Sequence, residues 1–259
     1  MNWLEAVILG FIQGLTEFLP ISSTGHLYIG RHLFGLEEAG LFLDTMLHLG
    51  TLLALLFFYR GILIKLLKNP FNKLTFLLII GTIPSIVIGL SLKDYFEEIS
   101  TTGVTIGWEF LITGTFLWYA DMIKKGEKKL EDIRVSDAFM IGVFQAAAIF
   151  PAISRSGMTI VGALIRKIDK ETAAYFSFLL SIPAIFGAVS LQSIDLVKNT
   201  HHHITFLSLF FASVSSALFG YLAVKWMIHY VKKHSLKVFA GYVWILGLLI
   251  ITLQSLGIW

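Results

Sequence analysis

Long apolar runs with almost no charge alternate along the chain with short segments that carry most of its charged residues. Six of these runs approach the roughly 20 residues that a helix needs to cross a hydrocarbon core. We predict transmembrane helices at about 41–59, 74–92, 104–120, 172–191, 204–224 and 238–256. No strand-like alternation accompanies them, and a backbone in lipid must satisfy its own hydrogen bonds. The pattern therefore predicts an all-α polytopic membrane protein.

Basic residues gather in three connecting loops, at about 60–73, 124–134 and 225–237. The positive-inside bias assigns all three loops to the cytoplasm. The segment 93–102 carries Asp94, Glu97 and Glu98 and is predicted to be external. When helices are counted from these assignments, two segments must each return to the side on which they began. We therefore predict re-entrant helical hairpins at 3–30 and 137–165, which enter from opposite faces.

The two re-entrant segments also resemble each other in sequence. Aligned without a gap, the identical positions include Gly10 with Gly142, Gln13 with Gln145, Phe18 with Phe150, Ser22 with Ser154 and Gly25 with Gly157. Each segment is an apolar helix that breaks at a proline and restarts at a hydroxyl-rich turn. Broken helices at matching positions in two halves indicate a binding site within the membrane. We predict an inverted-topology repeat over 1–120 and 137–259, joined by a cytoplasmic loop at 121–136.

Composition supports a membrane protein and excludes several kinds of chemistry. Of the 259 residues, 56% are hydrophobic and 14% are charged, against roughly 25% charged in soluble domains. The chain contains no cysteine, which excludes disulfides, thiolate nucleophiles and cysteine-ligated metals. The net charge of +3 follows from the basic loops, so no nucleic-acid partner is predicted. The first residues lack the basic segment and cleavage site of a signal peptide, and none is predicted.

The first hairpin holds an acidic residue in an apolar stretch. Gln13 and Glu17 are four residues apart and share one face of a helix. Because an ionised carboxylate in the membrane is costly, Glu17 is a functional candidate. The alternative is a glutamate at a helix end that snorkels or pairs with a lysine outside the bilayer.

A proline and three hydroxyl residues follow. Pro20 ends the first helix, because proline has no N–H and clashes with the preceding turn. The hydroxyls that can cap a second helix belong to Ser22, Ser23 and Thr24. A helix N-terminus binds anions, and Gly25 lets another group approach the backbone closely. His26 can exchange a proton near neutral pH; a lone histidine in a helix is more often structural, but these neighbours favour a function.

The second hairpin supplies a cation. Arg155 lies between Ser154 and Ser156, soon after Pro151, and Gly157 and Thr159 follow within one turn. A guanidinium in a bilayer needs an anionic partner, and its fork suits phosphate oxygens. The alternative is an ion pair with Glu17, and both pairings can hold at different stages of a cycle. Together the two hairpins predict a site for a phosphate or diphosphate that a lipid presents.

Two histidine-containing groups give weaker signals. Asp44 and His48 are four residues apart, so they either line this site or pair with each other. His201, His202 and His203 form a run in a predicted external loop. A metal site needs fixed geometry and outer-sphere support, and we do not predict a native metal site there.

The two hairpins resemble the bacterial undecaprenyl-diphosphatase family, the membrane pyrophosphatases also called bacitracin-resistance proteins. The motifs that carry the resemblance are QGLTEFLPISSTGH at 13–26 and PAISRSGMT at 151–159, with LHLGT at 47–51. The similarity extends over essentially the whole chain. Two positions depart from the family pattern: Gln13 stands where many members have glutamate, and Ala152 replaces the usual glycine. Glu17 is therefore paired with an amide rather than with a second carboxylate.

The resemblance implies hydrolysis of undecaprenyl diphosphate to undecaprenyl phosphate and inorganic phosphate. It places the protein in the bacterial plasma (inner) membrane with its site toward the external face, where it recycles the lipid carrier for peptidoglycan and envelope polymers and confers bacitracin resistance. It implies a divalent cation, Mg²⁺ or Ca²⁺, with Glu17 and Gln13 as ligands. A polyprenyl-phosphate flippase is the alternative function, and either a monomer or a homodimer fits the sequence.

We assign roles to the hairpin residues as a mechanistic hypothesis. The predicted catalytic residues are Glu17, Ser23, His26 and Arg155. The predicted substrate-binding residues are Gln13, Ser22, Thr24, Gly25, Ser154, Ser156, Gly157 and Thr159. The nucleophile is left open between Ser23, His26 and water, since the sequence does not decide among them.

Overall fold

The computed structural model describes residues 1–36, 40–92, 95, 99, 102–198 and 205–258. Within these ranges, the regular elements are helices. The predicted acidic loop residues Asp94, Glu97 and Glu98 and the run His201–His203 lie outside the described residues.

The helices follow the predicted order. In the first half they are α1 (Trp3–Phe18), α2 (Ser23–Phe34), α3 (Gly40–Phe58), α4 (Arg60–Lys68), α5 (Lys73–Ser91) and α7 (Ile106–Met122). After a 3-10 turn at Leu130–Asp132, they are α8 (Val135–Ala147), α9 (Arg155–Ile165), α10 (Lys170–Lys198), α11 (Phe206–Lys233) and α12 (Lys237–Ser255). Each of the six predicted transmembrane runs coincides with a long helix, which confirms the all-α prediction.

The long helices have the length and composition of membrane spans. Among the described residues, α5, α10, α11 and α12 are each long and apolar enough to cross a bilayer. Helix α3 is followed after a bend of 75° by α4, and the two together meet the same criterion. Helix α7 has 17 residues and is slightly shorter. The chain is a multi-pass helical membrane protein.

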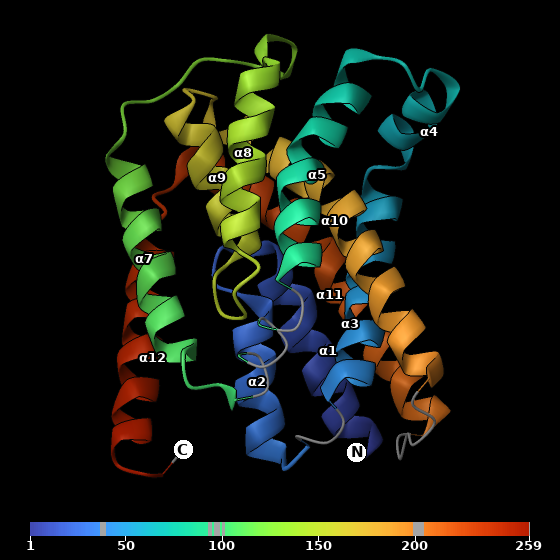
Figure 1. Cartoon of the computed structure of the whole chain (residues 1–259), viewed down its shortest axis with the longest axis vertical. Coiled ribbons are helices and arrows are strands. Elements are labelled where there is room, and N and C mark those ends of the chain that lie inside the picture. The colour runs from blue at the N-terminus through green and yellow to red at the C-terminus, as the bar shows by residue number, and fades with distance from the viewer. Residues whose placement is uncertain (37–39, 93–94, 96–98, 100–101, 199–204, 259) are drawn as a thin grey trace.

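Helices α1 and α2 form one hairpin, and α8 and α9 form the other. Figure 1 shows that α1 begins at the end of the molecule where both termini lie, whereas α8 begins at the opposite end. The two turning points meet between these ends. The Ser22 hydroxyl donates to the carbonyl of Pro151 (3.2 Å), and the Ser156 hydroxyl donates to the carbonyl of Leu19 (2.9 Å). The predicted opposed hairpins are therefore bonded to each other at their tips.

The two halves pack in the same pattern. Helix α1 runs along α11, and its counterpart α8 runs along α5, which is the counterpart of α11. Helices α7 and α12, the last of each half, pack against each other (Figure 1). This exchange of partners is what an inverted repeat produces. The repeat limits at residues 120 and 137 stay a prediction.

Two aligned glycines allow the hairpins to approach their neighbouring helices closely. A Cβ atom added at Gly142 would strike the backbone of Gly81 in α5, and one added at Gly10 would strike the carbonyl oxygen of Ala212 in α11. Helices in lipid associate through close van der Waals packing, so small residues gather where backbones approach. The glycines thus fix each first hairpin helix against its partner.

Ion pairs tie the loops to the helix ends at the end where α8 begins. Asp137 is buried in the first turn of α8 and accepts from Lys128 (3.0 Å) and from Arg166 (2.7 Å). Asp121, at the end of α7, accepts from Lys170 (2.8 Å). These contacts hold the loops before α8 and after α9 over the helix bundle.

We expect Gly142→Ala to destabilise the fold, because its methyl group has no space against the Gly81 backbone. Overpacking of this kind costs about 1–3 kcal/mol, which lowers Tm by several degrees. The matched control is Gly241→Ala in α12, where an added Cβ meets no atom within 4 Å. Thermal unfolding in detergent compares the two, and an equal Tm for both variants would contradict the close packing of α8 on α5.

Candidate functional site

Two capped helix N-termini face each other where the hairpins meet. The Ser22 hydroxyl accepts from the Gly25 N–H (3.3 Å) at the start of α2, and the Ser154 hydroxyl accepts from the Gly157 N–H (3.1 Å) at the start of α9. Ser22 and Ser154 are the aligned serines of the repeat, so the two halves use the same cap. Ser22 has a φ of 69°, a left-handed conformation that costs a residue with a side chain roughly 1–2 kcal/mol. The first N–H groups of each helix need partners from outside it.

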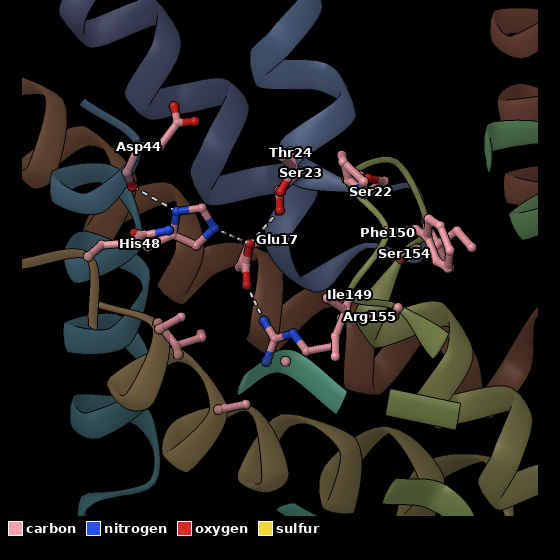
Figure 2. A pocket seen from close by; sticks show the side chains of 18 of the residues that line it. Glu17, Ser22, Ser23, Thr24, Asp44, His48, Ile149, Phe150, Ser154 and Arg155 are labelled. Carbon is pink, nitrogen blue, oxygen red and sulfur yellow. Dashed lines mark hydrogen bonds and ion pairs between the residues drawn. The ribbon is translucent and has the colours of Figure 1, made fainter. Parts of the chain in front are cut away.

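The buried carboxylate of Glu17 lies at the centre of the site (Figure 2). Its Oε2 accepts from the Ser23 hydroxyl (2.5 Å) and from the Gln13 amide nitrogen (2.9 Å). Its Oε1 forms an ion pair with Nη2 of Arg155, and Nε2 of His48 lies 3.7 Å from Oε2. The carboxylate therefore joins α1, α2, α3 and α9. It pairs with an arginine inside the protein and not with a lysine outside the bilayer.

A cavity of about 410 Å³ adjoins this carboxylate. Its polar lining includes Glu17, Ser22, Ser23, Thr24, Asp44, His48, Ser154 and Arg155. Nη1 of Arg155 is buried, and no acceptor in the described part of the chain bonds to it. The guanidinium is thus paired with Glu17 through one amino group and keeps the other for an anion, so the two interpretations of Arg155 are compatible.

The two candidate histidines occupy different surroundings. Nδ1 of His26 donates to the carbonyl of Ser22 (2.6 Å), and its Nε2 bonds to the hydroxyl of Tyr242 (2.8 Å). His26 does not line the cavity, although it is only three residues from Ser23. Its contacts hold the turn that carries the hydroxyls. A catalytic role for His26 stays a prediction, which the present geometry supports only through this positioning.

His48 points into the cavity instead (Figure 2). Its Nδ1 donates to the backbone carbonyl of Asp44 (2.7 Å), which leaves Nε2 toward Glu17. The Asp44 side chain also lines the cavity and forms an ion pair with Arg31 of α2. Of the two sequence interpretations, lining of the site is the one observed. Arg31 was not predicted, although a charged residue five positions after His26 in a mostly apolar helix was a signal for it.

The remaining predicted substrate-binding residues lie in the hairpin contacts rather than in the cavity lining. A Cβ at Gly25 would meet the ring of Phe110 at 2.6 Å, and one at Gly157 would lie 3.3 Å from Pro20. The Thr159 hydroxyl donates to the Arg155 carbonyl (2.9 Å) within α9. Gly25, Gly157 and Ser156 pack or bond the tips together, whereas Thr159 also bonds to Ser177 of α10 (2.6 Å). The predicted contact of these residues with substrate stays a prediction.

Helix α7 provides two site residues that the sequence analysis missed. The buried carboxylate of Glu109 accepts from the backbone N–H of Ala152 and from the Thr105 hydroxyl (2.6 Å). One turn on, the Thr113 hydroxyl accepts from the Ser154 N–H (3.2 Å) and donates to the Ala152 carbonyl (3.4 Å). Together they satisfy the backbone of the turn that precedes Arg155. Their signal was a pair of polar residues spaced four apart in an apolar run.

The predicted cation ligands form only part of a coordination shell. In the described part of the chain, no three histidine, aspartate or glutamate residues gather closely enough to hold a metal ion. Oε1 of Gln13, however, is buried beside Glu17 and has no hydrogen-bond partner among the described residues. One carboxylate and one amide oxygen fit Mg²⁺ or Ca²⁺ when substrate phosphates supply further ligands. The donor set is thus compatible with a cation that binds together with a phosphorylated substrate.

We expect Thr113→Val to loosen the second tip, because the buried Ser154 N–H and Ala152 carbonyl would lose their partner. Unsatisfied buried groups of this kind cost about 1–3 kcal/mol. The matched control is Thr115→Val on the same helix, whose exposed hydroxyl donates to the Leu111 carbonyl within that helix. Hydrogen exchange at residues 150–156, measured beside Tm, tests this; equal exchange in both variants would show that Thr113 does not hold the turn.

Comparison with known proteins places the chain among proteins of known activity. Residues 6–249 match the family described as Bacitracin resistance protein BacA. The chain is 68% identical over 254 residues to Undecaprenyl-diphosphatase 4 of Bacillus cereus strain ZK / E33L, with 98% of each chain covered. It is 48% identical over 262 residues to Undecaprenyl-diphosphatase of Carboxydothermus hydrogenoformans, with 99% of each covered. The chain therefore belongs to the BacA bacitracin resistance protein family.

Proposed function

We propose that the chain hydrolyses undecaprenyl diphosphate to undecaprenyl phosphate and inorganic phosphate, and thereby confers resistance to bacitracin. The names of its relatives support this reaction. The observation that carries the proposal is the group of buried Glu17 with partly buried Ser23 and Arg155 at two helix N-termini, since it combines a nucleophile, a base and an anion-binding group. The basic loops lie at the end where α8 begins, and the positive-inside bias assigns that end to the cytoplasm. We therefore also place the protein in the bacterial plasma membrane with the cavity serving the opposite, external face.

The diphosphate would bind where positive charge converges. The N-termini of α2 and α9 both adjoin the cavity, and helix N-termini favour anions through free N–H groups and the helix dipole. The unpaired Nη1 of Arg155 adds a charged donor, which forms stronger hydrogen bonds to phosphate than a neutral one. These groups are fixed before substrate arrives, so they stabilise developing negative charge without reorganisation.

Ser23 is the nucleophile that the geometry favours. Its hydroxyl lines the cavity and donates to Glu17, so the carboxylate can take the proton as the Ser23 oxygen bonds to the terminal phosphorus. The bond from that phosphorus to the bridging oxygen then breaks and undecaprenyl phosphate leaves. Water then attacks the phosphorus of the resulting phosphoserine, Glu17 returns the proton to the Ser23 oxygen as that P–O bond breaks, and inorganic phosphate leaves. His26 has no contact with the cavity, which makes it the weaker candidate.

Glu17 and Gln13 would hold a divalent cation, Mg²⁺ or Ca²⁺, and its charge would neutralise that of the phosphoryl oxygens. Gln13 meanwhile keeps Glu17 in place through its amide nitrogen. His48 faces the same carboxylate oxygen from α3 and closes that side of the cavity.

The first test measures phosphate release from undecaprenyl diphosphate by purified protein in detergent, with and without Mg²⁺ or Ca²⁺. We expect cation-dependent release that falls by about 10²–10³ in Arg155→Ala, as when other preorganised donors are removed. Arg155→Lys keeps the charge but loses the fork, and the loss of one charged hydrogen bond, about 1.5–3 kcal/mol, predicts a fall of tenfold or more.

Arg166→Lys is the control for these variants, since Arg166 bonds to Asp137 away from the cavity. Unchanged turnover in Arg155→Lys would show that the second amino group of the Arg155 fork does not bind the substrate. No release from well-folded wild-type protein would reject the phosphatase and favour the flippase.

A second test addresses the nucleophile. We expect Ser23→Ala to reduce release by orders of magnitude, because the attacking oxygen is gone, whereas Ser190→Ala, whose hydroxyl bonds within α10 to Phe186, leaves it unchanged. Acid quenching of wild-type turnover followed by mass spectrometry should find a phosphoryl group on Ser23. Full activity of Ser23→Ala would show that water or another residue attacks.

A further inference from the structure

A second cavity lies along α5, between that helix, α4 and α10. Its volume is about 480 Å³. Apart from Thr75 and Thr82, its lining is aliphatic or proline, including Leu63, Leu66 and Leu67 of α4 and Pro183 of α10. The Thr82 hydroxyl donates to the Leu78 carbonyl of its own helix and so is already satisfied. The Thr75 hydroxyl is buried and has no partner among the described residues. The lining therefore offers hydroxyls but no charged side chain, and its aliphatic surface suits an apolar chain.

One face of α5 lines both cavities. Leu78, Thr82 and Ile86 line the second cavity at helical spacing, and Gly89 continues the same row into the first. Leu78 and Thr82 are buried and form a floor, while Ile79, Ile83 and Ile86 beside them are partly exposed and form a rim. The face therefore forms an apolar path from the diphosphate cavity toward α4.

Gly89 leaves space on α5 where that helix lines the first cavity. A Cβ added at Gly89 would meet just one atom within 4 Å, the Cδ1 of Ile149 at 3.7 Å. Gly89 is thus not a close-packing glycine like Gly142, and its missing side chain leaves space. Figure 1 shows α5 beside α10, with α4 to the right of its upper half, so the path follows the bundle from its middle toward the α4 end.

We propose that this α5 path and the second cavity hold the isoprenoid chain of the lipid whose diphosphate occupies the first cavity. The inference rests on the proposed function, which places a diphosphate beside Gly89. The chain is covalently attached to that diphosphate and must leave the cavity through apolar surroundings. The row Gly89, Ile86, Thr82 and Leu78 supplies them along one face of α5, with Thr82 as its only polar member.

The lengths of α5 and of the isoprenoid chain distinguish a substrate whose chain passes Ile79 from one whose chain does not. Ile79 is ten residues from Gly89, about 15 Å along the helix. An extended chain advances about 1.1–1.2 Å per bond, as a polypeptide does. The three isoprene units of farnesyl diphosphate, twelve bonds, reach about 14 Å, whereas the eleven units of undecaprenyl diphosphate reach about 50 Å. Only the long chain can pass Ile79.

The experiment compares these two diphosphates with wild-type protein and Ile79→Trp, which fills the cavity from its rim. We expect KM for undecaprenyl diphosphate to rise about tenfold, equivalent to ~1.4 kcal/mol, while KM for farnesyl diphosphate stays within about twofold. Ile245→Trp is the matched control, since Ile245 is an exposed isoleucine of α12 away from both cavities.

Each outcome bears on one of the two claims. Unchanged KM for both substrates in Ile79→Trp overturns the chain path, as expected if a bilayer phospholipid fills the cavity, yet leaves the phosphatase intact. An equal loss for both substrates also overturns it. Absence of phosphate release from either substrate by wild-type protein rejects the proposed function instead.

A measurement without turnover keeps the path testable in that case. A polyprenyl phosphate with a diazirine at the far end of its chain should label residues 63–67 or 78–86 when irradiated with wild-type protein. Labelling confined to other helices, such as α12, overturns the proposal.

Discussion

The buried carboxylate of Glu17 is the constraint on which the rest of the structure depends. A charge at this depth is costly unless it is paired and hydrogen-bonded, and its counter-charge, Arg155, comes from the other half of the chain. The site therefore exists only when both hairpins reach the same level. Loss of either partner would leave an uncompensated buried charge, a penalty of about 3–5 kcal/mol. Folding and assembly of the site are thus one event.

The tips themselves pose a second problem, because they are irregular backbone inside a membrane protein. Such backbone is tolerated where protein groups satisfy it. Here the hairpins satisfy each other through Ser22 and Ser156, and α7 satisfies the second tip through Glu109 and Thr113. The close glycine contacts of α1 and α8 set how far each hairpin reaches. The N–H groups left at the helix starts are then available to an anion.

The hairpins, their opposed directions and the meeting of Glu17 with Arg155 could be predicted, because repeats, loop charge and proline breaks are signals within the sequence. It could not be predicted that His48 lines the cavity while His26 does not. Spacing of four residues shows that two side chains share a face, but the direction of that face depends on packing. Glu109 and Thr113 could not be predicted for a related reason. They lie on α7 and bond to the backbone of the second hairpin, and such bonds impose no spacing that can be read from the sequence.

The pairing of Glu17 with Arg155 raises the question of how the site accepts an anion without dismantling itself. A carboxylate beside a diphosphate is repulsive, so the attraction must exceed it. Two helix N-termini and the second amino group of Arg155 provide that attraction while Nη2 stays on Glu17. Substrate then adds to the charge network instead of replacing a member of it. The same ion pair can hold the hairpins together while substrate binds, which reconciles a stable membrane fold with a reactive carboxylate at its centre.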